Sequence, residues 1–156
     1  MQMTRFLPDE AATLAFGAEL ARALVPGLVI YLQGDLGAGK TTLTRGVLRG
    51  LGYAGKVKSP TYTLVELYTV SKLSLYHFDF YRFADPHECV DAGFREYFNP
   101  DTVCLVEWPE KAGEFLPAPD VRIALSVADG GRSLQVNAET EAGKKWFKHV
   151  AQAASA

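Results

Sequence analysis

One short segment of this 156-residue sequence has the residue types and spacing of a phosphate-binding loop. The segment reads GDLGAGKTT and satisfies the pattern GxxxxGK(S/T) through Gly34, Gly39, Lys40 and Thr41. Small residues let such a loop wrap so that consecutive backbone N–H groups point at the phosphates of a nucleotide. The lysine reaches the same phosphates, and the threonine hydroxyl binds Mg²⁺. The residues expected to bind the nucleotide are Gly34, Asp35, Leu36, Gly37, Ala38, Gly39, Lys40, Thr41 and Thr42.

Glu107 is the first candidate for the acidic residue that a nucleotide-bound metal requires. It ends the apolar run 103–106, and Trp108-Pro109 stops the predicted strand directly after it. Ligands of open α/β sheets bind beyond the carboxyl ends of the strands, so this position suits a metal ligand. We expect Glu107 to hold Mg²⁺ together with Thr41. The alternative is a solvated glutamate at a strand end.

Asp79 is the second acidic candidate and lies in the segment HFDFYR. In an extended strand His77, Asp79 and Tyr81 share one face, because successive side chains alternate. A carboxylate among aromatic residues needs a polar partner. We expect Asp79 to orient either a water on Mg²⁺ or the attacking water, which makes it a candidate catalytic residue. The alternative is a structural aspartate that only accepts hydrogen bonds.

The phosphate-binding interpretation requires a strand before the loop and a helix after it. Residues 28–33 read LVIYLQ, a continuously apolar run typical of a strand that is covered on both faces. Residues 40–51 read KTTLTRGVLRGL and predict a helix that ends near Gly50 and Gly52. The sequence therefore supplies the order strand, loop, helix that phosphate binding requires. The alternative is an incidental glycine-rich turn, which would not require that order.

Strands and helices are expected along the rest of the chain as well. Pro8, Asp9 and Glu10 begin a helix with apolar residues at near-helical spacing, and Pro26-Gly27 ends it. Asp129-Gly130-Gly131 marks a hairpin turn. Further strands are predicted at 61–70, 73–83, 102–108, 120–128 and 132–138, and further helices at 85–98 and 139–154. This order predicts an α/β fold of three layers, with a mixed sheet flanked by helices.

The composition is that of an ordinary globular protein, with 48% hydrophobic and 22% charged residues. We expect one domain over 1–156, with any disorder confined to the tail at about 151–156. Sixteen basic against 18 acidic residues give a net charge of −2, which disfavours unaided binding to nucleic acid. Cys89 and Cys104 lack the spacing of a metal or redox site and are expected to be reduced.

The sequence indicates neither a membrane-spanning segment nor a signal peptide. The longest apolar run, at 28–32, is far shorter than the roughly 20 residues that cross a bilayer. The first residues include Pro, Asp and Glu where a signal peptide needs an apolar segment. We therefore expect a cytoplasmic protein with no membrane span.

Four segments in a fixed order resemble the TsaE family, also called YjeE. They are GDLGAGKTT, VKSPTYTLVELY, HFDFYR and LVEWPEK, and they extend from Gly34 to Lys111. The resemblance implies a P-loop NTPase-like ATPase that uses ATP and Mg²⁺ and is needed for threonylcarbamoyladenosine synthesis beside the tRNA anticodon. It also implies that the chain acts with the TsaD and TsaB proteins, meets tRNA only through their complex, and does not itself transfer the threonylcarbamoyl group.

The resemblance assigns roles to individual residues. Lys40 and Thr41 match the phosphate and Mg²⁺ contacts, and Asp79 and Glu107 match the acidic positions of the family. Thr61, in the switch-like SPTY loop, is implied to approach the γ-phosphate and is a third candidate catalytic residue; the alternative is an ordinary turn. The aromatic residue after Glu107 matches the family pattern, although a plain core residue would explain it too. No readable motif contacts the base, so the adenine preference follows from the resemblance alone.

Two other functions fit a phosphate-binding loop. A small-molecule kinase would use Mg²⁺ and Lys40 too, but such enzymes usually carry an arginine-bearing lid. After the helix that follows the loop, the sequence has only isolated arginines, Arg82, Arg95, Arg122 and Arg132. A nucleotide-dependent switch that barely hydrolyses ATP overlaps with the family interpretation, while a regulatory GTPase would need an Asn-Lys-x-Asp signature that is absent. Without an evident arginine finger, turnover should be slow.

Overall fold

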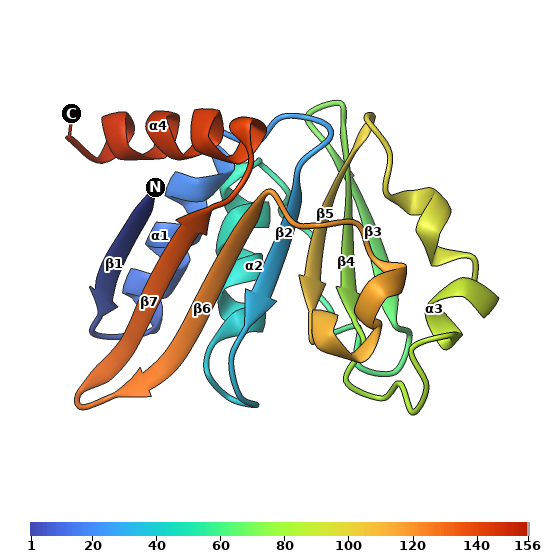
Figure 1. The fold of residues 1–156 in the computed structure, drawn as a ribbon. Helices are drawn as coiled ribbons and strands as arrows, with labels where there is room; N and C mark the ends of the chain where they lie inside the picture. The colour runs from blue at the N-terminus through green and yellow to red at the C-terminus, as the bar shows by residue number, and fades with distance from the viewer. Residues whose placement is uncertain (156) are drawn as a thin grey trace.

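A seven-stranded mixed sheet is the framework of the computed structural model, which describes residues 1–155 (Figure 1). The strands lie in the order β1-β7-β6-β2-β5-β4-β3. Strand β2 pairs in parallel with β5 and β6, and β4 pairs in parallel with β5, whereas the outer pairings are antiparallel. The bounds are β1 Gln2–Leu7, β2 Val29–Gln33, β3 Val65–Val70, β4 Leu73–Asp79, β5 Thr102–Glu107, β6 Val121–Ala128 and β7 Gly131–Ala138.

Helices and short turns pack on both faces of this sheet, which confirms the predicted three-layer α/β fold. Helices α1 (Glu10–Ala21), α2 (Lys40–Gly50) and α4 (Glu141–Ser155) contribute to one apolar cluster. The opposite face, over β3 to β5, carries an aromatic cluster with the short helix α3 and three 3₁₀ turns. These elements are α3 Glu88–Asp91, η1 Phe94–Tyr97, η2 Pro109–Lys111 and η3 Gly113–Phe115.

The central strand β2 is buried on both faces, which accounts for its continuously apolar sequence. Ile30 and Leu32 belong to the cluster under α1 and α2. Val29 and Tyr31 belong to the cluster on the other face. Strand β2 therefore has little freedom to shift its register, and it fixes the position of the loop that follows it.

Helix α2 is held against α1 by a close backbone contact at two glycines. A Cβ atom on Gly17 would lie 2.5 Å from the carbonyl oxygen of Leu43, and one on Gly46 would lie 2.4 Å from that of Leu14. Any larger residue at either position would push the helices apart. This contact sets the place of α2, whose first residue is Lys40.

Four local predictions differ from the structure. The strand predicted at 73–83 ends at Asp79, so Tyr81 lies outside it. Strand β1 was not expected, because its alternating exposed residues carry no apolar run. The strand predicted at 61–70 begins only at Val65, since Leu64 has a left-handed φ of +71°. The helix predicted at 85–98 is divided into α3 and η1 at Gly93, whose φ is +73°.

The structure shows the surroundings of the two cysteines and of the C-terminal tail. Cys89 and Cys104 are both buried, with free thiols. Helix α4 extends through Ser155, so the tail considered for disorder, 151–156, begins within this helix, and residue 156 lies outside the described residues. The assignment of 1–156 to a single domain stays a prediction.

Candidate functional site

The predicted phosphate loop lies between β2 and α2, at the edge of the sheet where the parallel strands end (Figure 1). Three of its glycines have positive φ angles: +148° at Gly34, +81° at Gly37 and +109° at Gly39. At Gly34 the restriction is also steric, because a Cβ atom would lie 2.4 Å from the carbonyl oxygen of Leu125 in the neighbouring strand β6. The loop conformation therefore depends on glycine at these positions.

Lys40 is buried at the start of α2 and faces the acidic side of the site. Its Nζ donates a hydrogen bond to the carbonyl oxygen of Gly34 and lies 3.9 Å from Oε1 of Glu107. The ammonium group also lies over the ring of Trp108, 4.3 Å from its centroid. Burial lowers the pKa of Lys40, and the nearby Glu107 carboxylate opposes this effect. The lysine is thus a desolvated cation that an anionic ligand would stabilise.

Asp79 and Glu107 lie side by side, because they end the parallel neighbours β4 and β5 and are paired in register. Both carboxylates are buried. Oε2 of Glu107 lies 2.6 Å from Nε2 of His77. Oδ1 of Asp79 accepts a hydrogen bond of 2.9 Å from the backbone N–H of Tyr81. The two acidic candidates are therefore oriented by polar neighbours rather than solvated.

The SPTY loop contacts Asp79 through its threonine. The hydroxyl of Thr61 donates to Oδ2 of Asp79 at 3.2 Å, and it lies 2.8 Å from the hydroxyl of Ser59. The loop is closed by a 2.7 Å hydrogen bond from the N–H of Leu64 to the carbonyl of Pro60. This turn replaces the first residues of the predicted strand and places Thr61 beside the phosphate loop.

A cavity of about 250 Å³ joins these side chains. Of the predicted loop residues, Gly34, Asp35 and Ala38 lie outside its lining. Ala38 is buried and donates its N–H to the carbonyl oxygen of Asp35 at 3.1 Å, so these residues shape the loop. The lining consists of Leu36, Gly37, Gly39, Lys40, Thr41, Thr42, Ser59, Thr61, Asp79 and Glu107.

The donor atoms of this cavity fit Mg²⁺. Thr41 offers a hydroxyl oxygen, and Asp79 and Glu107 offer carboxylate oxygens, the hard ligands that Mg²⁺ prefers. Across residues 1–155 no group of three or more His, Cys, Asp and Glu side chains forms a metal site by itself. Mg²⁺ is commonly held by one or two carboxylates together with substrate phosphates, and this sparse donor set agrees with that arrangement.

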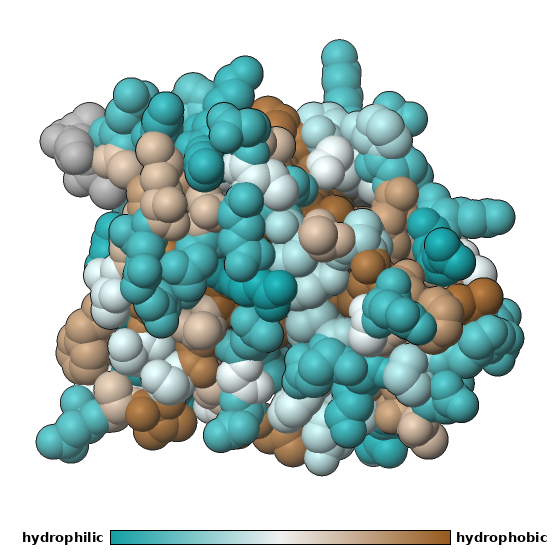
Figure 2. Space-filling model, in the orientation of Figure 1, coloured by the Kyte–Doolittle hydropathy of each residue, from teal (hydrophilic) through white to brown (hydrophobic). Residues whose placement is uncertain are grey.

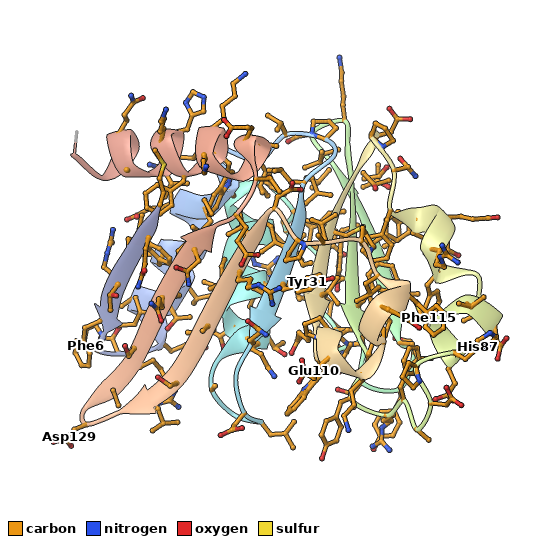
Figure 3. The ribbon with its side chains drawn as sticks, viewed as in Figure 1. Phe6, Tyr31, His87, Glu110, Phe115 and Asp129 are labelled. Atoms are coloured by element: carbon orange, nitrogen blue, oxygen red, sulfur yellow. The ribbon has the colours of Figure 1, made fainter. Side chains whose placement is uncertain are left out.

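A second cavity, of about 190 Å³, lies beside the phosphate loop and was missed by sequence reasoning. It is bounded by the β1–α1 connection, the loop and the β6–β7 turn, including Asp9, Thr13 and Arg132. The guanidinium of Arg132 donates to the carbonyl oxygen of Gly37 at 3.4 Å. In Figure 3, Phe6 marks the end of β1 and Asp129 the tip of the β6–β7 hairpin, both at the lower left. No sequence signal joined these segments, because β1 itself was not predicted.

The surface and the helices can be compared with the expectation that the chain has no membrane span. Figure 2 shows hydrophilic and apolar residues interspersed over the viewed face. Among residues 1–155, no helix has both the length and the hydropathy that a bilayer crossing requires.

Comparison with known proteins places the chain among relatives of one kind. Residues 7–134 match the family model described as "Threonylcarbamoyl adenosine biosynthesis protein TsaE". The tRNA threonylcarbamoyladenosine biosynthesis protein TsaE of Haemophilus influenzae is 48% identical over 147 residues, covering 91% of this chain and 93% of the relative. The protein of that name from Bacillus subtilis is 44% identical over 122 residues, covering 78% and 74%. The crystal structure of Bacillus subtilis YdiB superposes with a TM-score of 0.83 at 33% identity, covering 99% of this chain and 97% of that one.

Proposed function

This chain belongs to the TsaE family of tRNA threonylcarbamoyladenosine biosynthesis proteins, and on this premise we propose that it acts there as a Mg²⁺-dependent ATPase. The observation that carries the proposal is the cavity in which Lys40 and Thr41 of the phosphate loop meet Asp79 and Glu107. One face of this cavity is suited to anionic phosphates, and the other offers the acidic groups that hydrolysis needs.

The loop residues and Lys40 bind the phosphates. Backbone N–H groups at the start of α2 face an anion favourably, because the helix N-terminus carries a partial positive charge. The buried ammonium of Lys40 exchanges the carbonyl of Gly34 for phosphate oxygens. Thr41 and Glu107 would hold Mg²⁺, which when bound neutralises charge on the β- and γ-phosphates.

Asp79 and Thr61 act on the water that attacks the γ-phosphate. Asp79 ends β4, and its hydrogen bond to Thr61 keeps the threonine hydroxyl and the carboxylate next to each other in the lining of the cavity. The carboxylate of Asp79 orients the water, and Thr61 approaches the γ-phosphate.

Turnover in the isolated chain should be slow. No arginine is found among the residues that line this cavity in the described part of the chain. An arginine finger supplied by a partner is worth about 10³ to 10⁵ in rate for related phosphoryl transfers. We therefore assign TsaD and TsaB, the partners implied by the family resemblance, the role of completing or regulating the site, in the cytoplasm and with tRNA bound by their complex.

The nucleoside half of ATP occupies the second cavity. The linings of the two cavities share Gly37, Gly39 and Thr42, so a nucleotide can extend along the loop from one cavity into the other. Arg132 and Thr13 offer polar groups there, and Leu7 and Pro8 offer apolar surface.

The first test is calorimetric titration of the purified chain with ATP, followed by ATPase assays with and without the TsaB–TsaD complex. We expect Mg²⁺-dependent binding, slow hydrolysis by the chain alone, and a changed rate with the complex. Lys40→Ala should abolish binding, while Lys144→Ala, an exposed lysine on α4, should bind like the wild type. Efficient phosphoryl transfer to a small alcohol or a nucleoside would contradict the proposal and favour the kinase alternative.

A further inference from the structure

The contact between His77 and Glu107 has no role in the mechanism so far. His77 lies in β4 and Glu107 ends the neighbouring strand β5. The side chain of His77 is fully buried, and its Nε2 lies 2.6 Å from Oε2 of Glu107. A carboxylate oxygen only accepts hydrogen bonds, so Nε2 is the donor and carries the proton of this bond.

The rest of the imidazole makes this contact unusual. Nδ1 of His77 is buried and has no hydrogen-bond partner among residues 1–155. A buried polar atom without a partner destabilises the fold, because it gives up its hydrogen bond to water and gains none in return. An apolar side chain would fill this interior position without that cost, so the bond to Glu107 is what the histidine adds.

The bond fixes one end of the Glu107 carboxylate. With Oε2 held by His77, the other oxygen, Oε1, faces Lys40 at 3.9 Å on the side of the phosphate cavity. The two oxygens of Asp79, in contrast, each accept a hydrogen bond, from Thr61 and from the backbone of Tyr81. Oε1 of Glu107 is therefore the carboxylate oxygen best placed to bind a cation at the phosphates.

We propose that His77 is a positioning residue, which holds Glu107 so that Oε1 points to the Mg²⁺ site of the bound nucleotide. The inference rests on the proposed Mg²⁺-dependent ATP binding. Hydrogen-bond partners behind metal ligands commonly change metal affinity by about 10- to 100-fold when they are removed. The same range is expected here for the Mg²⁺-dependent part of ATP affinity.

The test compares ATP affinity with and without Mg²⁺, measured by calorimetry, in wild type, His77→Leu and His77→Gln. In His77→Leu, the gain in affinity from Mg²⁺ should fall about tenfold or more, whereas Mg²⁺-free affinity should be unchanged. His77→Gln should restore most of the gain, because its amide N–H reaches the place of Nε2. Leu75→Met, a volume-conserving change on the same face of β4, is the control and should behave like wild type.

A double mutant separates positioning from general damage. If His77 acts through Glu107, adding His77→Leu to Glu107→Gln should cause no further loss of the Mg²⁺-dependent gain. His77→Asn, whose shorter amide cannot reach Glu107, serves in place of His77→Leu should the leucine variant not fold, and should show the same loss. Equal loss of affinity with and without Mg²⁺, additive losses in the double mutant, or an unchanged gain in His77→Leu would each overturn the inference. Absence of Mg²⁺-dependent ATP binding in the wild type would instead overturn the proposed function on which the inference rests.

Discussion

At the scale of single residues, the buried charge of Lys40 serves ATP binding but lowers the stability of the nucleotide-free protein. Its ammonium is buried, and burial lowers its pKa, so its charged form is disfavoured in the nucleotide-free fold. Lys40→Met keeps the volume and removes the charge. Without nucleotide, Lys40→Met should melt at a temperature at least equal to that of the wild type. ATP should raise the melting temperature of the wild type but not that of Lys40→Met. Thermal melts with and without ATP and Mg²⁺ measure both effects.

The difference in stability between the wild type and Lys40→Met should depend on pH. Because the pKa of Lys40 is lower in the folded protein than its ordinary value of 10.5, the unfolded chain binds more protons in that interval. The free energy of unfolding of the wild type should therefore rise, relative to that of Lys40→Met, as the pH increases toward 10.5. A variant that melts well below the wild type near neutral pH would show that the contacts of Lys40 outweigh its desolvation.

How far single residues could be predicted depends on how far away their partners lie in the sequence. The spacing from Gly34 to Thr41 is local, and Asp79 and Glu107 each follow from a strand end, so the sequence points to them. The function of His77 depends on a bond across 30 residues, and that of Arg132 on one across 95. Such pairings arise from sheet order, which no short pattern contains.

At the scale of elements, the contact between α1 and α2 controls the placement of the site. A Cβ at position 46 would meet the backbone of Leu14, which cannot move away as a flexible side chain could. Gly46→Ala should therefore lower the free energy of unfolding by about 1–3 kcal/mol, despite the better helix propensity of alanine. Chemical denaturation measures the change.

The matched control for this prediction lies on the same helix. Arg45 forms a partly exposed ion pair with Glu10, at 3.6 Å, so Arg45→Ala should cost no more than about 1 kcal/mol. Equal stability of Gly46→Ala and wild type would mean that the helices separate freely, and that their contact does not fix the start of α2.

Elements were predictable where apolar periodicity was strong and unpredictable where a single residue or an edge decided. The runs in β2 and β5 mark strands buried on both faces. Strand β1 is recruited at the sheet edge by pairing with β7, although its own residues alternate between exposed and partly buried. The break at Gly93 follows from its left-handed φ. Glycine permits this conformation, but its presence in the sequence does not predict it.

At the scale of the whole molecule, net charge limits which partners the chain can bind alone. With 16 basic and 18 acidic residues, the surface offers little attraction to a phosphate backbone, although phosphate contacts dominate nucleic-acid affinity. The phosphate loop does not change this balance, because Lys40 is buried. The chain should therefore meet tRNA through a complex that supplies the positive surface.

A binding measurement with labelled tRNA at physiological salt tests this expectation. The chain alone, with or without ATP, should show no more than the weak, non-specific affinity expected of proteins without a basic surface, with Kd above about 10⁻⁶ M. When the TsaB–TsaD complex holds the tRNA, the labelled species should grow larger on addition of the chain with ATP. Lys40→Ala should fail to produce that increase if the nucleotide is required for docking. Tight binding of tRNA by the chain alone, weakening steeply with salt, would show that a local cationic surface overrides the net charge, and would make the protein a direct tRNA reader.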